Sequence, residues 1–168
     1  MKLLLFRQHA GDLLSSVIVD DTRTIYTHAA ILIDEATNKI SEAYIPHVRS
    51  RFLLDSELAG IDAFDIDFLT PEKEAAVVAY CMAAEAAKEP YSIENLCRFN
   101  PLFRKILGEA TDLTIHSPVI CSQYVFDAFD RAAGIKLLNA QSYQIAPGYL
   151  AWSPLLFPAR ALKPVGRV

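Results

Sequence analysis

Short stretches rich in apolar residues alternate with turn residues over the first seventy positions of the chain. Residues 27–33 and 40–45 predict two strands, and the segment 34–39 between them (DEATNK) has the composition of a turn. These strands therefore predict an antiparallel hairpin that ends at Pro46. Further short strands are predicted at 51–54 and 64–69.

Helical signals replace the strand pattern after position 70. Thr70 can cap a helix, Pro71 suits its first turn, and acidic residues follow at the positive end of the helix dipole. This helix is predicted to run to about Lys88, and because its middle is apolar on all sides we expect it to be buried. Shorter helices are predicted at 93–99, 101–107 and 121–133, the last two ending at Gly108 and Gly134.

Strands first, helices next and a Pro-rich, aromatic-rich tail from Ala146 predict an α+β fold, with short strands and turns in the tail. The chain has 168 residues, of which 52% are hydrophobic and 21% charged, and these values predict one globular domain over 1–168. The net charge of −4 is small and the basic residues are scattered, so no nucleic-acid partner is predicted.

The sequence predicts neither a membrane span nor a metal site. No run approaches the ~20 apolar residues that a spanning helix needs, and the apolar stretch after Lys2 is too short for a signal peptide. We therefore expect a cytoplasmic protein. The acidic residues, histidines and cysteines do not have the spacing of metal ligands, so we expect no metal and no other cofactor.

Three cysteines occur, and their odd number and wide spacing argue against a disulfide framework. Cys121 is the one placed at a predicted helix start, after Pro118, where the helix dipole stabilises a thiolate. Cys81 and Cys97 fall inside predicted helices and are interpreted as small core residues. By its position alone, Cys121 is compatible with either role.

His28 is the candidate base for that thiol. An isolated histidine on an apolar strand is more often a core residue than a catalyst, but Glu42 on the returning strand changes the picture, because a buried carboxylate needs a partner. If the hairpin register pairs Ala30 with Glu42, then His28 and Glu42 are diagonal neighbours on one face. A slip of one residue would move Glu42 to the other face. Glu42 can then accept a hydrogen bond from one ring nitrogen and leave the other for the thiol.

Four short motifs occur in order along the chain: Gly11–Leu14 (GDLL), Tyr26–Ile31 (YTHAAI), Ser41–Ala43 (SEA) and Ile120–Val125 (ICSQYV). Together they resemble the YiiX-like family, whose members are permuted relatives within the NlpC superfamily of papain-like enzymes. The order His, Glu, Cys is typical of the permutation, since the cysteine helix comes first in ordinary papain-like proteins. The resemblance spans about residues 11–153, and it departs from the family pattern at Ala30 and Gln123, where the family has Gly and Glu.

The resemblance implies a circularly permuted papain-like (NlpC-type) fold, in which an antiparallel sheet or barrel packs against helices. It implies a cysteine peptidase or amidase that cleaves an amide or ester bond through an acyl-enzyme, with Cys121 as nucleophile, His28 as base and Glu42 as the group that orients His28. The expected substrate is a peptide-like or acyl-bearing small molecule, in a bacterial or phage context. Two alternatives stay open: an acyltransferase acting on lipid acyl groups, and a non-catalytic module that binds peptides or lipids.

Overall fold

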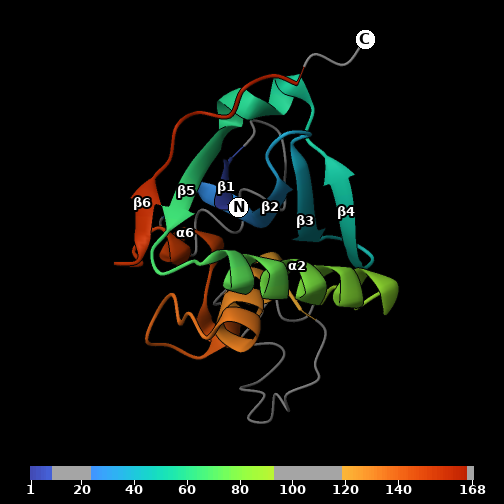
Figure 1. Cartoon of the computed structure of the whole chain (residues 1–168), viewed down its shortest axis with the longest axis vertical. Coiled ribbons are helices and arrows are strands. Elements are labelled where there is room, and N and C mark those ends of the chain that lie inside the picture. Colours follow the sequence, from blue (N-terminus) through green and yellow to red (C-terminus); the bar gives the residue numbers. More distant parts are fainter. Residues whose placement is uncertain (9–23, 93–118, 166–168) are drawn as a thin grey trace, which may run out of the picture.

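A single antiparallel sheet organises the molecule (Figure 1). The computed structural model describes residues 1–8, 24–92 and 119–165. The six strands lie in the order β4-β3-β2-β1-β5-β6, and each neighbouring pair is antiparallel. The order is linear, so the sheet is open, with β4 and β6 at its two edges. The strands are β1 (Lys2–Arg7), β2 (Tyr26–Asp34), β3 (Lys39–Ala43), β4 (Val48–Phe52), β5 (Ile61–Ile66) and β6 (Leu156–Pro158).

The predicted hairpin is confirmed as β2 and β3. The Asp34 side chain accepts hydrogen bonds from the Ala36 backbone N–H and the Thr37 hydroxyl, which stabilises the intervening turn. The ladder pairs Ile31 with Ser41 and Leu32 with Ile40. Continuing this register by one residue sets Ala30 opposite Glu42, so the predicted register is correct.

Strand β1 is not among the predicted elements, although it lies in the middle of the sheet between β2 and β5. Its residues Leu3, Leu4 and Leu5 are fully buried. A strand covered on both faces has a continuous apolar run without the alternation that marks a half-exposed strand. Strands β4 and β5 are confirmed, but each begins three residues before its predicted range, at Val48 rather than 51 and at Ile61 rather than 64.

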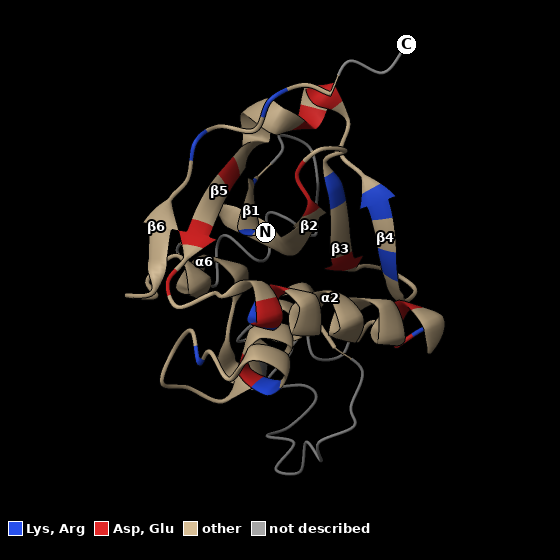
Figure 2. Cartoon of the chain, in the orientation of Figure 1, with Lys and Arg blue, Asp and Glu red and all other residues tan. Residues whose placement is uncertain are grey.

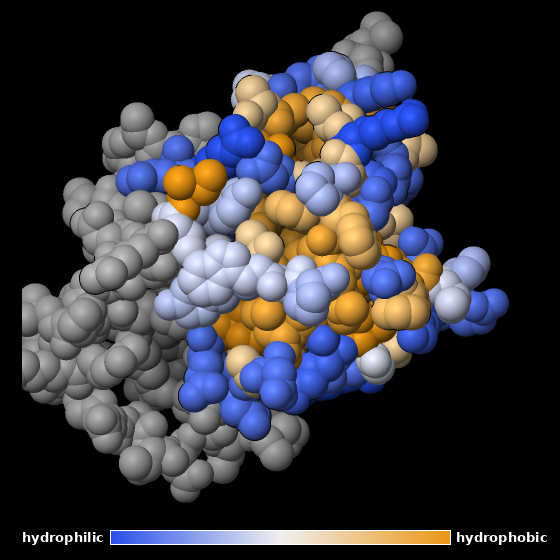
Figure 3. Space-filling view, turned by 90° about the vertical axis from the view of Figure 1, so that its left-hand side faces the viewer, coloured by the Kyte–Doolittle hydropathy of each residue, from blue (hydrophilic) through white to orange (hydrophobic). Residues whose placement is uncertain are grey.

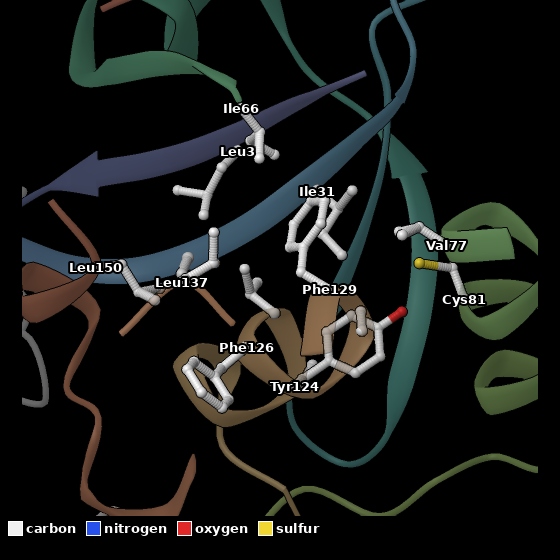
Figure 4. Close-up of a cluster of buried hydrophobic side chains, with 14 of the residues drawn as sticks. Leu3, Ile31, Ile66, Val77, Cys81, Tyr124, Phe126, Phe129, Leu137 and Leu150 are labelled. Carbon is white, nitrogen blue, oxygen red and sulfur yellow. The ribbon is translucent and has the colours of Figure 1, made fainter. Parts of the chain in front are cut away.

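Helices cover one face of the sheet and enclose the larger core (Figure 4). Leu3 and Ile31 of the sheet face Phe129 and Tyr124 from the helical layer. The helices are α2 (Pro71–Ala86), α5 (Cys121–Asp127), its π-helical continuation η2 (Ala128–Ala132), the short η3 (Ser142–Gln144) and α6 (Pro147–Leu150). The predicted helix over 121–133 is thus confirmed as α5 and η2, and Gly134 follows it with a φ of 63°.

The other face of the sheet carries a smaller core, which includes Leu4, Phe6 and Leu32. The 3-10 helix η1 (Asp55–Gly60) and the C-terminal segment cover it through Leu58 and Leu162. The tail therefore packs across the sheet as expected, although its first part forms helix α6 rather than a strand or turn.

Helix α2 begins as predicted but is not buried on all sides. The Thr70 hydroxyl accepts a hydrogen bond from the Lys73 backbone N–H at 3.4 Å, which confirms the cap. Only Val77, Cys81 and Ala84 are buried, and they form one stripe along the helix. The prediction of a fully buried helix is wrong because the remaining apolar residues are mostly alanines, which favour helix but have little side chain to bury.

Several predicted features lie outside the described residues: the Gly11–Leu14 motif, the helices at 93–99 and 101–107, and Cys97. Within the described ranges, no helix combines the length and apolar composition required to cross a membrane.

Candidate active site

Cys121 is the first residue of α5, and the backbone before it is extended. The Ser122 hydroxyl donates a hydrogen bond to the Ile145 carbonyl at 2.5 Å and thereby anchors the first turn to the segment before α6. All seven residues of α5 are buried, and Cys121 itself is only 1% exposed. The sequence therefore places a thiol at a rigid helix start whose first N–H groups have no acceptor within the helix.

His28 and Glu42 meet on the face of the sheet that carries the smaller core. His28 Nε2 and Glu42 Oε2 are 2.9 Å apart, as the diagonal relation in the hairpin requires. The His28 ring makes edge contacts with the rings of Phe6 and Tyr44, with centroids 5.1 Å and 6.0 Å away. Because Nε2 is engaged by Glu42, Nδ1 is the ring nitrogen that remains for another partner.

Cys121 is the other side chain that interacts with the His28 ring, since it is among the groups that raise the pKa of His28. Burial lowers the pKa of His28, but the charge and hydrogen bond of Cys121 and the hydrogen bond and charge of Glu42 raise it further. The net pKa of His28 is about 9. The structure thus brings together the three residues that the sequence singles out, from β2, β3 and the start of α5.

The Glu42 carboxylate is fully buried and is held by two arginines from β4 as well as by His28. Arg49 donates to Oε1 through Nε at 2.9 Å and has Nη2 2.8 Å away, and Arg51 Nε donates to the same oxygen at 2.8 Å. Oε2 faces His28. Figure 2 shows the acidic end of β3 beside the basic strand β4. Both guanidinium groups therefore lie on one carboxylate oxygen and direct the other toward the imidazole.

Burial raises the pKa of Glu42, but the hydrogen bonds and charges of His28 and Arg51 outweigh it and lower this pKa to about 2. Glu42 is therefore ionised in neutral solution. Arg51 is in turn held by a second carboxylate, since its Nη1 and Nη2 donate to the two oxygens of Glu57 at 2.8 Å and 2.9 Å. Arg49 lies over the Tyr44 ring, with its Cζ 4.1 Å from the centroid.

These arginines are not among the residues that the sequence singles out, although the segment Val48–Phe52 (VRSRF) carries a signal for them. Arg49 and Arg51 are two positions apart, so in a strand they share one face. They fall opposite the strand that contains Glu42 only because β3 pairs with β4, with Glu42 directly opposite Arg49. A buried carboxylate in one strand and two basic residues on one face of the next strand are the pattern that would predict this cluster.

Cys81 is buried like Cys121 but differs from it in its place in the helix and in its neighbours. It lies in the middle of α2, fully buried, within hydrogen-bonding reach of Tyr124 and Ser41. Burial raises the pKa of its thiol, and hydrogen bonds with Tyr124 and Ser41 oppose this shift. Its interpretation as a core residue is confirmed.

The structure defines an α+β protein in which a helix-start cysteine, a strand histidine and a buried glutamate converge. No protein-family model matches the chain, and no curated protein matches it. Its fold is similar to that in the crystal structure of metalloprotein yiiX (DUF1105) from Escherichia coli O157:H7. The TM-score is 0.66, the sequences are 14% identical, and the match covers 97% of each chain. The YiiX-like fold that the motifs imply is therefore present over nearly the whole chain.

Proposed function

We propose that this protein is a cysteine hydrolase that cleaves an amide or ester bond, with Cys121 as nucleophile, His28 as proton carrier and Glu42 as the group that orients His28. The observation that carries this proposal is that one imidazole interacts with two partners: Glu42, 2.9 Å from Nε2, and Cys121, whose charge and hydrogen bond raise the pKa of His28. The same order of elements, His strand, Glu strand, Cys helix, supports a circularly permuted papain-like fold.

The chemistry begins when His28 takes the proton of the Cys121 thiol. The Cys121 thiolate forms a bond to the substrate carbonyl carbon, and the carbonyl electron pair moves to the oxygen. When this adduct collapses, the bond to the leaving group breaks, and the leaving amine takes the proton from His28 Nδ1. Water then attacks the thioester while Nδ1 accepts its proton, the C–S bond breaks, and the acid leaves.

The backbone N–H of Cys121 is the natural donor to the developing oxyanion, because it lies at the helix start without an intrahelical acceptor. Glu42 keeps the ring in the required orientation and stabilises its positive charge. The ionised Glu42 is suited to both roles, since the arginines hold its charge in place.

The solved structure of similar fold is described as that of a metalloprotein. Within the described part of this chain, no group of three or more His, Cys, Asp or Glu side chains is arranged to hold a metal ion. Glu42 Oε1 already accepts from two guanidinium groups, whose positive charge opposes a cation at the same oxygen. These residues do not fit a metal site, and the proposed steps use none.

Peptide-resolved mass spectrometry of alkylation tests the proposal. Iodoacetamide should modify Cys121 at least tenfold faster than Cys81 in the same molecule, and His28→Gln should remove this advantage. His47→Gln is the matched control, because the hydrogen bond of the His47 ring within the described residues goes to the carbonyl of its neighbour Val48, and this change should leave the rate unchanged. Equal rates at the two cysteines, or indifference to His28→Gln, would overturn the assignment.

Turnover separates the hydrolase from its alternatives. With p-nitrophenyl acetate, wild-type protein should acquire an acetyl group on Cys121 and then lose it to water, and Cys121→Ala should do neither. Transfer of that acetyl group to an added amine in preference to water would instead indicate an acyltransferase. Rapid alkylation of Cys121 without any acylation would indicate a binding module.

A further inference from the structure

Arg49 has donors that the site does not use. Its Nε and Nη2 both point to Glu42 Oε1, which occupies one side of the planar guanidinium. The opposite edge, formed by Nη1 and the second N–H of Nη2, has no partner among the described residues. Arg51 differs, because its Nε binds Glu42 and both of its terminal nitrogens bind Glu57. Among the contacts of the described residues, Arg49 is the one of the two arginines that retains an edge able to donate two hydrogen bonds to a ligand.

Arg49 is also the less neutralised of the two. Glu42 shares its single charge among Arg49, Arg51 and His28, whereas Arg51 has a second carboxylate in Glu57. Arg49 is 39% exposed and Arg51 is 27% exposed. A guanidinium with an open edge and incomplete charge compensation is suited to a planar anion, which it can bind with two parallel hydrogen bonds.

The Arg49 side chain is held in place before any ligand arrives. Glu42 fixes one edge, and the Tyr44 ring lies against the flat face of the guanidinium at 4.1 Å. Arginine normally loses rotamer entropy when it binds a ligand, and here that loss has already occurred on folding. The open edge is therefore a pre-oriented donor pair rather than a mobile surface charge.

The position of Arg49 relates it to the reacting groups. Arg49 and His28 contact the same carboxylate, and Tyr44 contacts both of them, since its ring meets His28 edge-on at 6.0 Å. Cys121 is almost fully covered, whereas Tyr44 is 47% exposed. The His28 side chain is 18% exposed and Arg49 is 39% exposed, so Tyr44 and Arg49 are the more exposed groups beside the imidazole.

We propose that Arg49, supported by Tyr44, is a specificity-determining residue that binds a carboxylate of the substrate close to the scissile bond. This inference rests on the proposed cysteine-hydrolase function and adds the substrate class: acyl compounds that carry an anionic carboxylate near the carbonyl that Cys121 attacks.

Two alkylating reagents of nearly equal size test this proposal. Iodoacetate carries a carboxylate and iodoacetamide is its neutral analogue, so the ratio of their rates at Cys121 reports the preference of the site for a carboxylate. Arg49→Gln should lower this ratio roughly fivefold at low ionic strength, the scale of a partly exposed ion pair. Arg49→Lys should retain part of the preference, because it keeps the charge but loses the paired donors. Added salt should weaken the preference in the wild type.

Arg51→Gln is the matched control, because it also removes one guanidinium from Glu42 Oε1 but has no open edge. It should slow both reagents to a similar extent and leave their ratio unchanged. If Arg49→Gln leaves the ratio at the wild-type value, or if Arg51→Gln lowers it equally, Arg49 only positions Glu42 and the proposal is wrong. Those outcomes leave the proposed hydrolase intact as long as Cys121 still reacts faster than Cys81. Circular dichroism of each variant confirms that the compared proteins are folded.

Should Arg49→Gln not fold, the wild type provides an independent measurement. Succinate should slow the alkylation of Cys121 by iodoacetamide, and neutral succinamide at the same concentration should not. Equal protection by both compounds, or protection by neither, would overturn the carboxylate assignment.

Discussion

Replacing Glu42 with glutamine keeps the size of the side chain and removes the charge on which three cationic partners depend. Glu42 is fully buried, and Arg49, Arg51 and His28 all contact it within 2.9 Å. Removing one member of a buried ion pair typically costs 3–5 kcal/mol, because the other charge is left uncompensated. Here the arginines are partly exposed and Arg51 keeps Glu57, so the lower part of that range applies.

The pKa of Glu42 gives a similar estimate of its contribution to the free energy of unfolding. It falls from its ordinary value of 4.5 to about 2 in the folded protein. Because one pKa unit corresponds to about 1.4 kcal/mol, the ionised carboxylate stabilises the fold by about 3 kcal/mol. We therefore expect Glu42→Gln to lower the free energy of unfolding by about 3 kcal/mol at pH 7.

The stabilisation by Glu42 should depend on pH, because its pKa is lower in the folded protein than in the unfolded chain. A carboxyl group whose pKa is depressed on folding contributes its full stabilisation above the unfolded value of 4.5, and loses it as the pH falls toward about 2. Urea denaturation at pH 7 and pH 3, followed by circular dichroism, should show a large difference between wild type and variant at pH 7 and a smaller one at pH 3. Glu57→Gln is the control, since Glu57 is partly exposed and binds only one of the arginines, and it should cost about 1 kcal/mol. A Glu42→Gln variant as stable as the wild type at pH 7, or a difference that does not shrink at pH 3, would refute the reasoning.

Three further predictions concern the site and its supports. The rate of amide hydrolysis should decline above about pH 9, because His28 then loses the proton that the leaving amine needs. The rate of alkylation by iodoacetamide should not decline over this pH range. A parallel loss of both rates would contradict this role of His28. Gly148→Ala should lower the free energy of unfolding by about 1–3 kcal/mol in urea denaturation, because a Cβ at this position would overlap the Thr24 side chain; an unchanged or higher stability would exclude that overlap. Tyr124→Phe should cost about 1 kcal/mol by the same measurement and leave Cys121 alkylation unchanged, because the Tyr124 hydroxyl bonds the buried Ser41 hydroxyl at 2.6 Å; a slower alkylation would show that this bond also supports the site.

The parts of the fold that the sequence predicts are those governed by local chemistry. The turn at Asp34, the cap at Thr70 and the stop at Gly134 each follow from a backbone preference of that residue or its neighbours. Strand β1 does not, because its apolar residues are buried on both faces and show no alternation. The sequence also fails to predict the exposed face of α2. Its alanines are classed as apolar, but their small side chains have little surface to bury.

The residues of the candidate site also differ in how far the sequence predicts them. Cys121, His28 and Glu42 are predictable because each is unusual in its own segment: a thiol at a helix start, an imidazole and a carboxylate in apolar strands. Arg49 and Arg51 are not unusual residues for a partly exposed strand, and their role at the site becomes clear only when β3 is paired with β4. Their contribution depends on register between strands, which a single strand's pattern does not specify.

The buried carboxylate of Glu42 requires positive charges from a neighbouring strand. A neutral orienting group, such as an amide, would need no counter-charge, whereas a buried carboxylate is costly unless cations accompany it. Both arginines come from the edge strand β4, which pairs only with β3 in the described sheet. The orientation and positive charge of His28 therefore depend on the docking of an edge strand that contributes none of the three proposed reacting or orienting residues. Replacing Ser50 of β4 with proline would remove a backbone N–H that donates to Glu85 and restrict the backbone of the preceding Arg49, which disturbs this edge without removing a side chain of the site. We expect this variant to lose the fast alkylation of Cys121 while Cys81 stays protected in the core; an unchanged rate at Cys121 would show that Glu42 holds His28 without the help of β4.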